Sequence, residues 1–254
     1  MGPFEDLFGK KKKFVARWKS AAADFHDDAP GHSDIGAKSP PPGLVAGNLL
    51  TVFKQAYSLR LQDGRQAIHV ETLLSSLGAM AGFGCQIAVR EGLVKTGVVP
   101  LERAFVVVRT THGSKYFMGD LLNQPLLEAP VSVWAFIAGA LKQVGAPEPD
   151  LKEIVRHVMS TLGGPNFGRL SVAREHQPHE QPLQSLTKQW AAAYKLVQAQ
   201  LGNPLFTGWY FAHAAQMLII EAKDVIDPTL AARIVMESAI AMAKVDPQSI
   251  GVEV

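Results

Sequence analysis

The sequence predicts an α+β protein that is predominantly helical, in which a bundle of about six helices carries one small antiparallel β-hairpin or sheet. Three observations support this fold class. Within the stretch from His69 to Leu93, the residues from Leu77 to Val89 are almost wholly apolar and leave no solvent-facing side. Most of the chain after Leu44 repeats its apolar residues at helical spacing. One stretch, from Ala104 to Met118, changes to the residue types of β-strands.

The composition is that of an ordinary globular protein, because 47% of the 254 residues are hydrophobic and 19% are charged. The net charge of +2 gives no electrostatic reason to expect a nucleic-acid partner. The single cysteine, Cys85, excludes an internal disulfide and is typical of a reducing compartment. The opening residues lack the continuous apolar core of a secretory signal. We therefore expect a cytoplasmic protein.

Residues 1–43 differ from the chain that follows them. The stretch from Gly9 to Lys19 contains basic residues and no acidic one. Wound as a helix, the apolar residues of this arm fall within an arc of about 120°. Such an arm is typical of an anchor that inserts aromatic side chains into a membrane surface while lysines meet anionic lipid. The residues proposed for membrane or partner binding are Phe4, Leu7, Phe8, Lys10, Lys11, Lys12, Lys13 and Trp18.

The opening MGPFEDLFGKK is similar to the openings of bacterial proteins that work at the inner membrane, a resemblance confined to this short stretch. Two other interpretations of the arm stay open: it packs on its own domain or a neighbouring subunit, or it has no fixed structure. The prolines of Ser39–Gly43 indicate an extended tether. The chain thus divides into an arm with its linker, 1–43, and a single helical α+β domain, 44–254.

The first helix of the body runs from Leu44 to Ala56, and Asp63-Gly64 marks a turn after it. The central helix comes next. From Leu77 to Val89 its only strongly polar side chain is Gln86, and a helix apolar all round belongs in a core or a membrane. The run is shorter than the roughly 20 residues of a membrane crossing, so we predict a buried helix capped by Gly92. The small residues that let other backbones approach it are Gly78, Ala79, Ala81, Gly82 and Gly84.

A β-hairpin is predicted after the central helix, with arms at Ala104–Thr111 and Lys115–Met118. His112-Gly113 lies at its turn, where glycine permits a positive φ. The segment Gly168–Arg174 is predicted to be a third strand beside the hairpin.

Local start and stop signals predict the remaining helices. Ser132 and Gly145 bound one of them, and Asp150 with Glu153 has the capping-box spacing that begins the next. Apolar stripes predict two more, from Leu183 to Leu201 and from Trp209 onward, and Asp227 caps a last helix that reaches about Lys244.

Several cations gather around the predicted sheet. Arg109, His112 and Lys115 surround the hairpin tip, and Arg174 lies on the strand expected to pair with it. If these side chains line one rim, they form a site for an anionic ligand or an acidic partner. The alternative is a solubilising face whose charges protect a sheet edge from pairing.

Other candidate residues give weaker indications. Cys85 lies in the most apolar run, where burial raises a thiol pKa and makes it inert. His176 and His179 occupy a proline-divided loop without an evident third metal ligand. His213 is expected to be a buried histidine bonded to a carbonyl or carboxylate. No catalytic motif occurs, so the sequence predicts no catalytic residue, metal or cofactor.

Two functions from different classes follow. The first is a non-catalytic interaction protein, a scaffold or accessory subunit, held by its arm at a membrane surface or a partner. The second is a small anionic-ligand-binding module or enzyme with a site between the hairpin and the helices. Because two apolar helices and four tryptophans leave much apolar surface to cover, we also expect a homodimer or larger assembly in which Trp209 or the last helix contributes.

Overall fold

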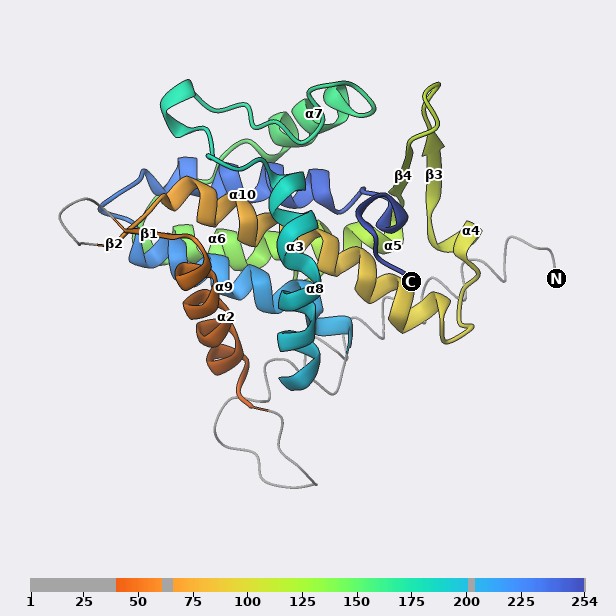
Figure 1. The fold of residues 1–254 in the computed structure, drawn as a ribbon, viewed down its shortest axis with the longest axis horizontal. Helices are drawn as coiled ribbons and strands as arrows, with labels where there is room; N and C mark the ends of the chain where they lie inside the picture. Colours follow the sequence, from red (N-terminus) through yellow and green to blue (C-terminus); the bar gives the residue numbers. More distant parts are fainter. Residues whose placement is uncertain (1–39, 61–65, 201–203, 254) are drawn as a thin grey trace.

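The computed structural model describes residues 40–60, 66–200 and 204–253 and confirms a predominantly helical α+β fold. The predicted arm residues, from Phe4 to Trp18, and the predicted Asp63-Gly64 turn lie outside the described residues. Figure 1 shows long helices stacked around one that runs through the middle, with a hairpin rising beside the C-terminus. One continuous hydrophobic cluster extends from Val45 to Val245.

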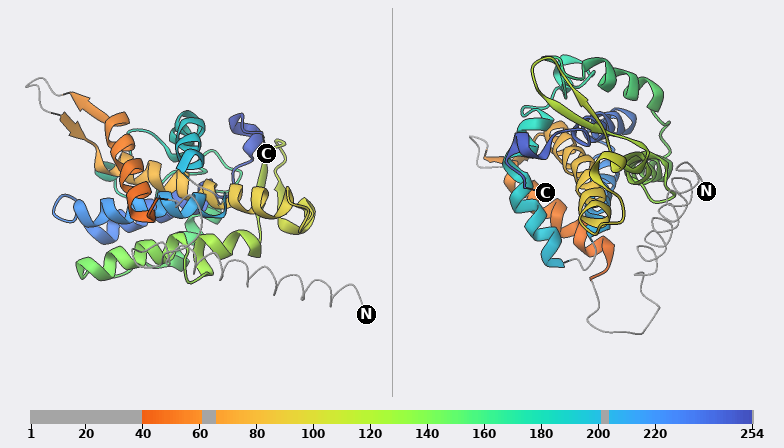
Figure 2. Two further views of the ribbon diagram at one scale, coloured as in Figure 1. Left: turned by 90° about the horizontal axis from the view of Figure 1, so that it is seen from below. Right: turned by 90° about the vertical axis from the view of Figure 1, so that its right-hand side faces the viewer.

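The central helix is α3 (Val70–Val89), which continues as one π-helical turn, η1 (Arg90–Val94). From Thr72 to Val89 every residue of α3 is buried, as its apolar sequence predicts. Figures 1 and 2 show it with other helices on several sides. Its closest neighbours are α8 (Pro182–Gln200), α9 (Thr207–Glu221) and α10 (Pro228–Met242).

Glycines allow α3 and α10 to touch backbone to backbone. A Cβ placed on Gly78 would overlap the carbonyl oxygen of Val235, and one placed on Gly82 would overlap that of Ala239. Four residues further along, Gln86 donates from Nε2 to the carbonyl oxygen of Ala243 at 2.8 Å. In each successive contact, the residue of α3 and its partner on the α10 side are both four positions further along the sequence. The two helices therefore run in the same direction. From Gly78 to Gln86, α3 is therefore in contact with α10 and the residue that follows it.

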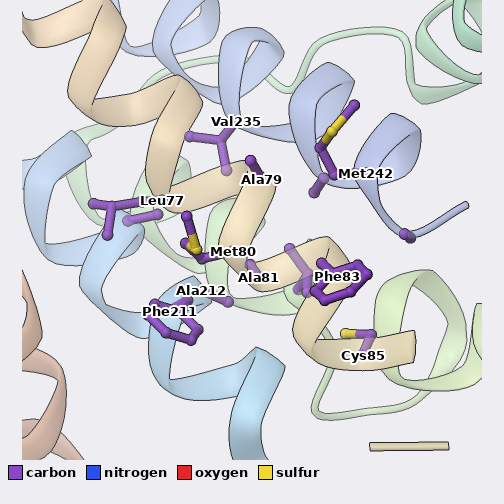
Figure 3. Close-up of a cluster of buried hydrophobic side chains, with 14 of the residues drawn as sticks. Leu77, Ala79, Met80, Ala81, Phe83, Cys85, Phe211, Ala212, Val235 and Met242 are labelled. Atoms are coloured by element: carbon purple, nitrogen blue, oxygen red, sulfur yellow. The ribbon is translucent and has the colours of Figure 1, made fainter. Parts of the chain in front are cut away.

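The opposite contact, with α9, also depends on glycine. A Cβ on Gly84 would lie 2.8 Å from the Cα of Gly208, and one on Gly208 would lie 2.7 Å from the carbonyl oxygen of Ala81. Larger side chains fill the space beside these contacts. Figure 3 shows Met80 of α3 next to Phe211 of α9. The sequence prediction that small residues bring other backbones close to this helix is thus confirmed.

The predicted cap of α3 at Gly92 is wrong. Gly92 lies inside the π-helical turn, and the chain first enters a left-handed conformation at Gly97, with φ 72°. Gly92 instead packs against the side chain of Leu205, which a Cβ at this position would overlap. The requirement for glycine here is therefore one of space, not of capping.

Most other predicted helix boundaries are confirmed. Ser132 accepts a hydrogen bond from the N–H of Ala135, Asp150 from that of Glu153, and Asp227 from that of Leu230. Gly145 ends its helix at φ 71°. The remaining elements before α8 are α2 (Pro42–Ala56), β1 (Ser58–Arg60), β2 (Gln66–Ile68), α4 (Leu101–Ala104), α5 (Asp120–Asn123), η2 (Gln124–Glu128), α6 (Val133–Val144), α7 (Leu151–Thr161) and η3 (Arg174–His176), with η4 (Pro204–Phe206) and η5 (Pro247–Ile250) after it.

The predicted hairpin is present as β3 (Val106–Arg109) and β4 (Lys115–Met118), which pair antiparallel. Its third neighbour is not the segment Gly168–Arg174, which forms no strand. Instead β4 meets the chain after α10, through a bridge between Tyr116 and Val245 and a hydrogen bond from the N–H of Phe117 to the carbonyl oxygen of Lys244.

The segment around Ser171 is held as a loop by a buried carboxylate. Glu237 of α10 is 1% exposed and accepts a hydrogen bond from the N–H of Ser171 at 2.6 Å. The same carboxylate pairs with Arg233, which also binds Glu153 of α7. Because this N–H is used by a side chain, it is not available to a β-ladder.

The apolar surface expected for self-association is not at Trp209. This side chain is fully buried, and its Nε1 donates to the carbonyl oxygen of Pro125 at 3.3 Å. Two stretches, Val70–Val94 and Asp120–Val144, are long and apolar enough to cross a membrane by length and composition. The first is entirely buried among other helices, a pattern that the core helix of a soluble protein also shows. Self-association stays a prediction.

Replacing Gly82 with alanine is expected to lower the free energy of unfolding by roughly 1–3 kcal/mol, because the new methyl group overlaps the α10 backbone. Gly47 of α2 is the matched control, since a Cβ there would lie 3.8 Å from the Cε of Met217, an ordinary contact. Gly47→Ala should stabilise the protein by about 0.5–1 kcal/mol through helix propensity. Urea unfolding of both variants tests this. Equal effects of the two substitutions would show that α3 and α10 are not in backbone contact.

Candidate functional site

A cleft of about 630 Å³ opens between the hairpin and the segment that follows α10. This volume lies in the range typical of sites that enclose a small organic molecule. The end of α3 contributes Arg90, and the hairpin contributes Lys115 and Phe117. The C-terminal segment contributes most of the remaining lining, including Asp246 and Glu253.

Arg90 is the buried cation of this cleft, with 8% of its surface exposed. Its Nε donates to Oε1 of Gln86 at 3.1 Å. Its Cζ lies 4.3 Å from the ring centroid of Phe117 and 5.0 Å from that of Phe105, a cation–π arrangement on two aromatic rings. Nη2 is buried and has no hydrogen-bond partner among the described residues. A buried donor without a partner is costly, so the Arg90 guanidinium has hydrogen-bonding capacity that the described residues leave unused.

Gln86 fixes the orientation of Arg90 and joins it to the far wall of the cleft. Its Nε2 donates to the carbonyl oxygens of Ala243, at 2.8 Å, and Val245, at 3.0 Å. Its Oε1 is left to accept from Arg90. A single buried amide therefore holds both the guanidinium and the start of the segment that lines the cleft.

The electrostatics of the cleft keep Arg90 charged at neutral pH. Burial lowers the pKa of Arg90 from 12.5 to about 10, and the nearby Asp246 carboxylate opposes this effect. The pKa stays well above neutrality. Lys115 adds a second cation to the lining, whereas Asp246 and Glu253 add two anions.

The structure brings together only part of the predicted cationic rim. Lys115 lines the cleft, and Arg109 lies opposite it in the β3–β4 register without lining the cleft. His112 lies in the hairpin turn. Arg174 lies in η3, which Figure 1 places at the upper left, across the molecule from the hairpin. Since the third strand that was to carry Arg174 does not form, the rim of four residues does not form either.

Arg90 was not selected by sequence reasoning, although a signal was present. Gln86 and Arg90 are four residues apart and are the strongly polar side chains at the end of an otherwise apolar helix. Residues at this spacing share one helix face. A polar pair on one face of a buried helix indicates a place where that helix meets something other than a packed core.

A second pocket, of about 180 Å³, lies where α3 begins. His69 caps the helix, accepting from the N–H of Thr72, and its ring stacks 3.7 Å from that of His179. The hydroxyl of Tyr57 donates to Glu180 at 3.0 Å, and burial raises the pKa of Tyr57. The polar side chains of this pocket are bonded or stacked on one another. Their contacts attach the loop before α8 to the start of α3.

The other titratable candidates are paired or inert. His176 lies 3.0 Å from Glu71, and in the described part of the chain no group of three or more His, Cys, Asp or Glu is arranged to hold a metal ion. Burial raises the pKa of Cys85, as predicted. His213 stacks on Phe136, and its Nδ1 has no hydrogen-bond partner among the described residues, so this nitrogen does not make the bond to a carbonyl or carboxylate predicted for the side chain.

Comparison with known proteins found no match: no family model, curated protein or solved structure is similar to this chain. The fold and the geometry of the cleft are therefore the observations from which a function is inferred.

Lys244 lies just after α10 and is buried, with 6% of its surface exposed. The pH dependence of stability therefore tests whether its ammonium group is buried. Burial lowers the pKa of Lys244 from 10.5 to about 8, and its Nζ donates to the carbonyl oxygen of Ile240 at 3.0 Å. Between these two pH values the unfolded chain binds more protons than the folded one, so stability rises with pH. Below the folded pKa both states are charged, and the full cost of burying the charge is present.

Lys244→Met is expected to raise the free energy of unfolding near neutral pH by up to about 3 kcal/mol. Methionine keeps an apolar stem in place and carries no charge. The gain over wild type should shrink as the pH approaches about 10. Urea unfolding of both proteins from neutral pH to about pH 10 measures the difference in their free energies of unfolding. Groups that titrate alike in the two proteins do not contribute to this difference. If the free energies of unfolding of the two proteins changed in parallel with pH, Lys244 would not be a buried cation with a lowered pKa.

Proposed function

We propose that this protein is a ligand-binding module that holds an anionic ligand in the Arg90 cleft, without a catalytic role for the residues named here. The observation that carries the proposal is Arg90 itself, a nearly buried cation that lines the cleft and whose guanidinium is only partly hydrogen-bonded by the described residues. Guanidinium groups form strong, directional hydrogen bonds with carboxylate and phosphate oxygens.

The packing around Arg90 supports a binding role. Gln86 and the rings of Phe105 and Phe117 hold the guanidinium in place before any ligand arrives. A ligand that binds a preorganised group loses less free energy to ordering. Lys115 lies at the more exposed side of the same cleft, where a second positive charge attracts anions. These features favour the ligand-binding hypothesis over a scaffold that acts only through its surface.

The test is thermal unfolding of the full chain with a panel of small carboxylates, phosphates and sulfates. A ligand at about 100 times its Kd stabilises the folded state by about 2.7 kcal/mol. For a chain of this size, that corresponds to a rise in Tm of roughly 5–10 °C. Arg90→Gln should remove this rise, because glutamine offers neither the charge nor the second donor.

Because Arg90 is buried, its variant needs a companion on the rim. Lys115→Gln should reduce the shift without disturbing the core, since Lys115 is only half-buried. Arg109→Gln is the matched control, because Arg109 lies opposite Lys115 on the hairpin but does not line the cleft. Equal shifts in wild type, Arg90→Gln and Lys115→Gln, or no shift with any anion, would refute the proposed function.

A further inference from the structure

The cleft has features that select among anions, and this inference rests on the proposed function. Nε of Arg90 is already bonded to Gln86, so the part of the guanidinium left for a ligand is the end that carries the Nη atoms. The guanidinium lies over the ring of Phe117, with Cζ 4.3 Å from the ring centroid, and its terminal nitrogens form a planar donor edge. A planar carboxylate matches such an edge with parallel hydrogen bonds.

The charges of the lining disfavour a ligand with several negative charges. Arg90 and Lys115 contribute two positive charges, and Asp246 and Glu253 contribute two negative ones. The lining is therefore neutral overall before a ligand enters. A single carboxylate can bind at the Arg90 end, whereas each further negative charge meets an acidic side chain without a spare cation.

The two long helices α3 and α10 point their C-terminal ends toward the cleft. Arg90 begins the π-helical turn η1 that ends the α3 helix, and Asp246 follows the C-terminus of α10. Helix C-termini carry partial negative charge, whereas phosphate sites commonly use the positive N-termini of helices. The partial negative charge at the end of α10 weakens the attraction for a phosphate dianion, and the two helical elements that begin at the cleft, α4 at Leu101 and η5 at Pro247, are only four residues long.

Apolar side chains form the rest of the wall. Leu101, Phe117, Pro247 and Val252 line the cleft beside the charged groups. Leu101 remains 37% exposed in the protein alone, so a ligand with an apolar body would cover it. We propose that the ligand is a small organic acid whose single carboxylate binds Arg90 and whose apolar body lies against Phe117 and Leu101.

A matched series of ligands tests this proposal by titration calorimetry on the full chain. Octanoate, octyl phosphate and octanol share one alkyl chain, and at a pH of about 8 the phosphate carries close to two negative charges. Octanoate should bind at least about tenfold more tightly than either of the others. Arg90→Gln should reduce octanoate affinity by about tenfold or more and leave octanol unchanged.

Two surface variants keep the test decisive if Arg90→Gln does not fold. Lys115→Gln should weaken octanoate binding, and Glu253→Gln should raise octyl phosphate affinity more than octanoate affinity, with Glu102→Gln of α4 as the control outside the lining. Tighter binding of octyl phosphate that depends on Arg90 or Lys115 would overturn the ligand class and leave the proposed function standing. Octanol binding as tightly as octanoate would also overturn it. Binding of no member of the series that depends on Arg90 or Lys115 would refute the inference and the proposed function together.

Discussion

The backbone contact between α3 and α10 is the constraint on which the rest of the structure depends. Gly78 and Gly82 bring the two helices too close for any side chain to fit between them. A row of residues spaced by four continues from these glycines through Gln86 to Arg90, and each residue in the row neighbours the next on the helix surface. At Gly78 and Gly82, this row of residues packs directly on the backbone of α10. Beyond the end of α10, the row continues with the polar residues Gln86 and Arg90. Gln86 donates hydrogen bonds to the segment that follows α10, and Arg90 lines the cleft.

This arrangement explains how a mostly apolar helix produces a polar site. Arg90 lies about 12 Å beyond Gly82 along the helix axis, past the last residue of α10 that α3 touches through glycine. Gln86 satisfies the first free carbonyl groups of the chain after α10, and the hairpin supplies aromatic rings that cover the guanidinium. A shift of α10 along α3 would move the carbonyl groups away from Gln86 and release Arg90. The geometry of the cleft therefore depends on the register of two buried helices.

The parts of the fold that depend on local signals were predicted from the sequence. The buried helix, the hairpin and the caps at Ser132, Asp150 and Asp227 need only neighbouring residues to form. The segment Gly168–Arg174 has the residues of a strand, but Glu237, which is distant in sequence, binds its backbone and keeps it a loop. The candidate site was predicted only as far as the hairpin and Lys115. Arg90 was missed because periodicity does not show which distant segments meet at a helix end, although Gln86 marked the face.

The most direct test of the central claim is a crystal structure of the full chain with octanoate. The account predicts a carboxylate oxygen within hydrogen-bonding distance of a terminal guanidinium nitrogen of Arg90, roughly 3 Å, with the alkyl chain against Phe117 and the bond from Arg90 to Gln86 retained. An octanoate bound instead to Arg109 at the hairpin tip would contradict it. So would a structure in which Nη2 is bonded to Asp246 and the cleft is closed to the ligand.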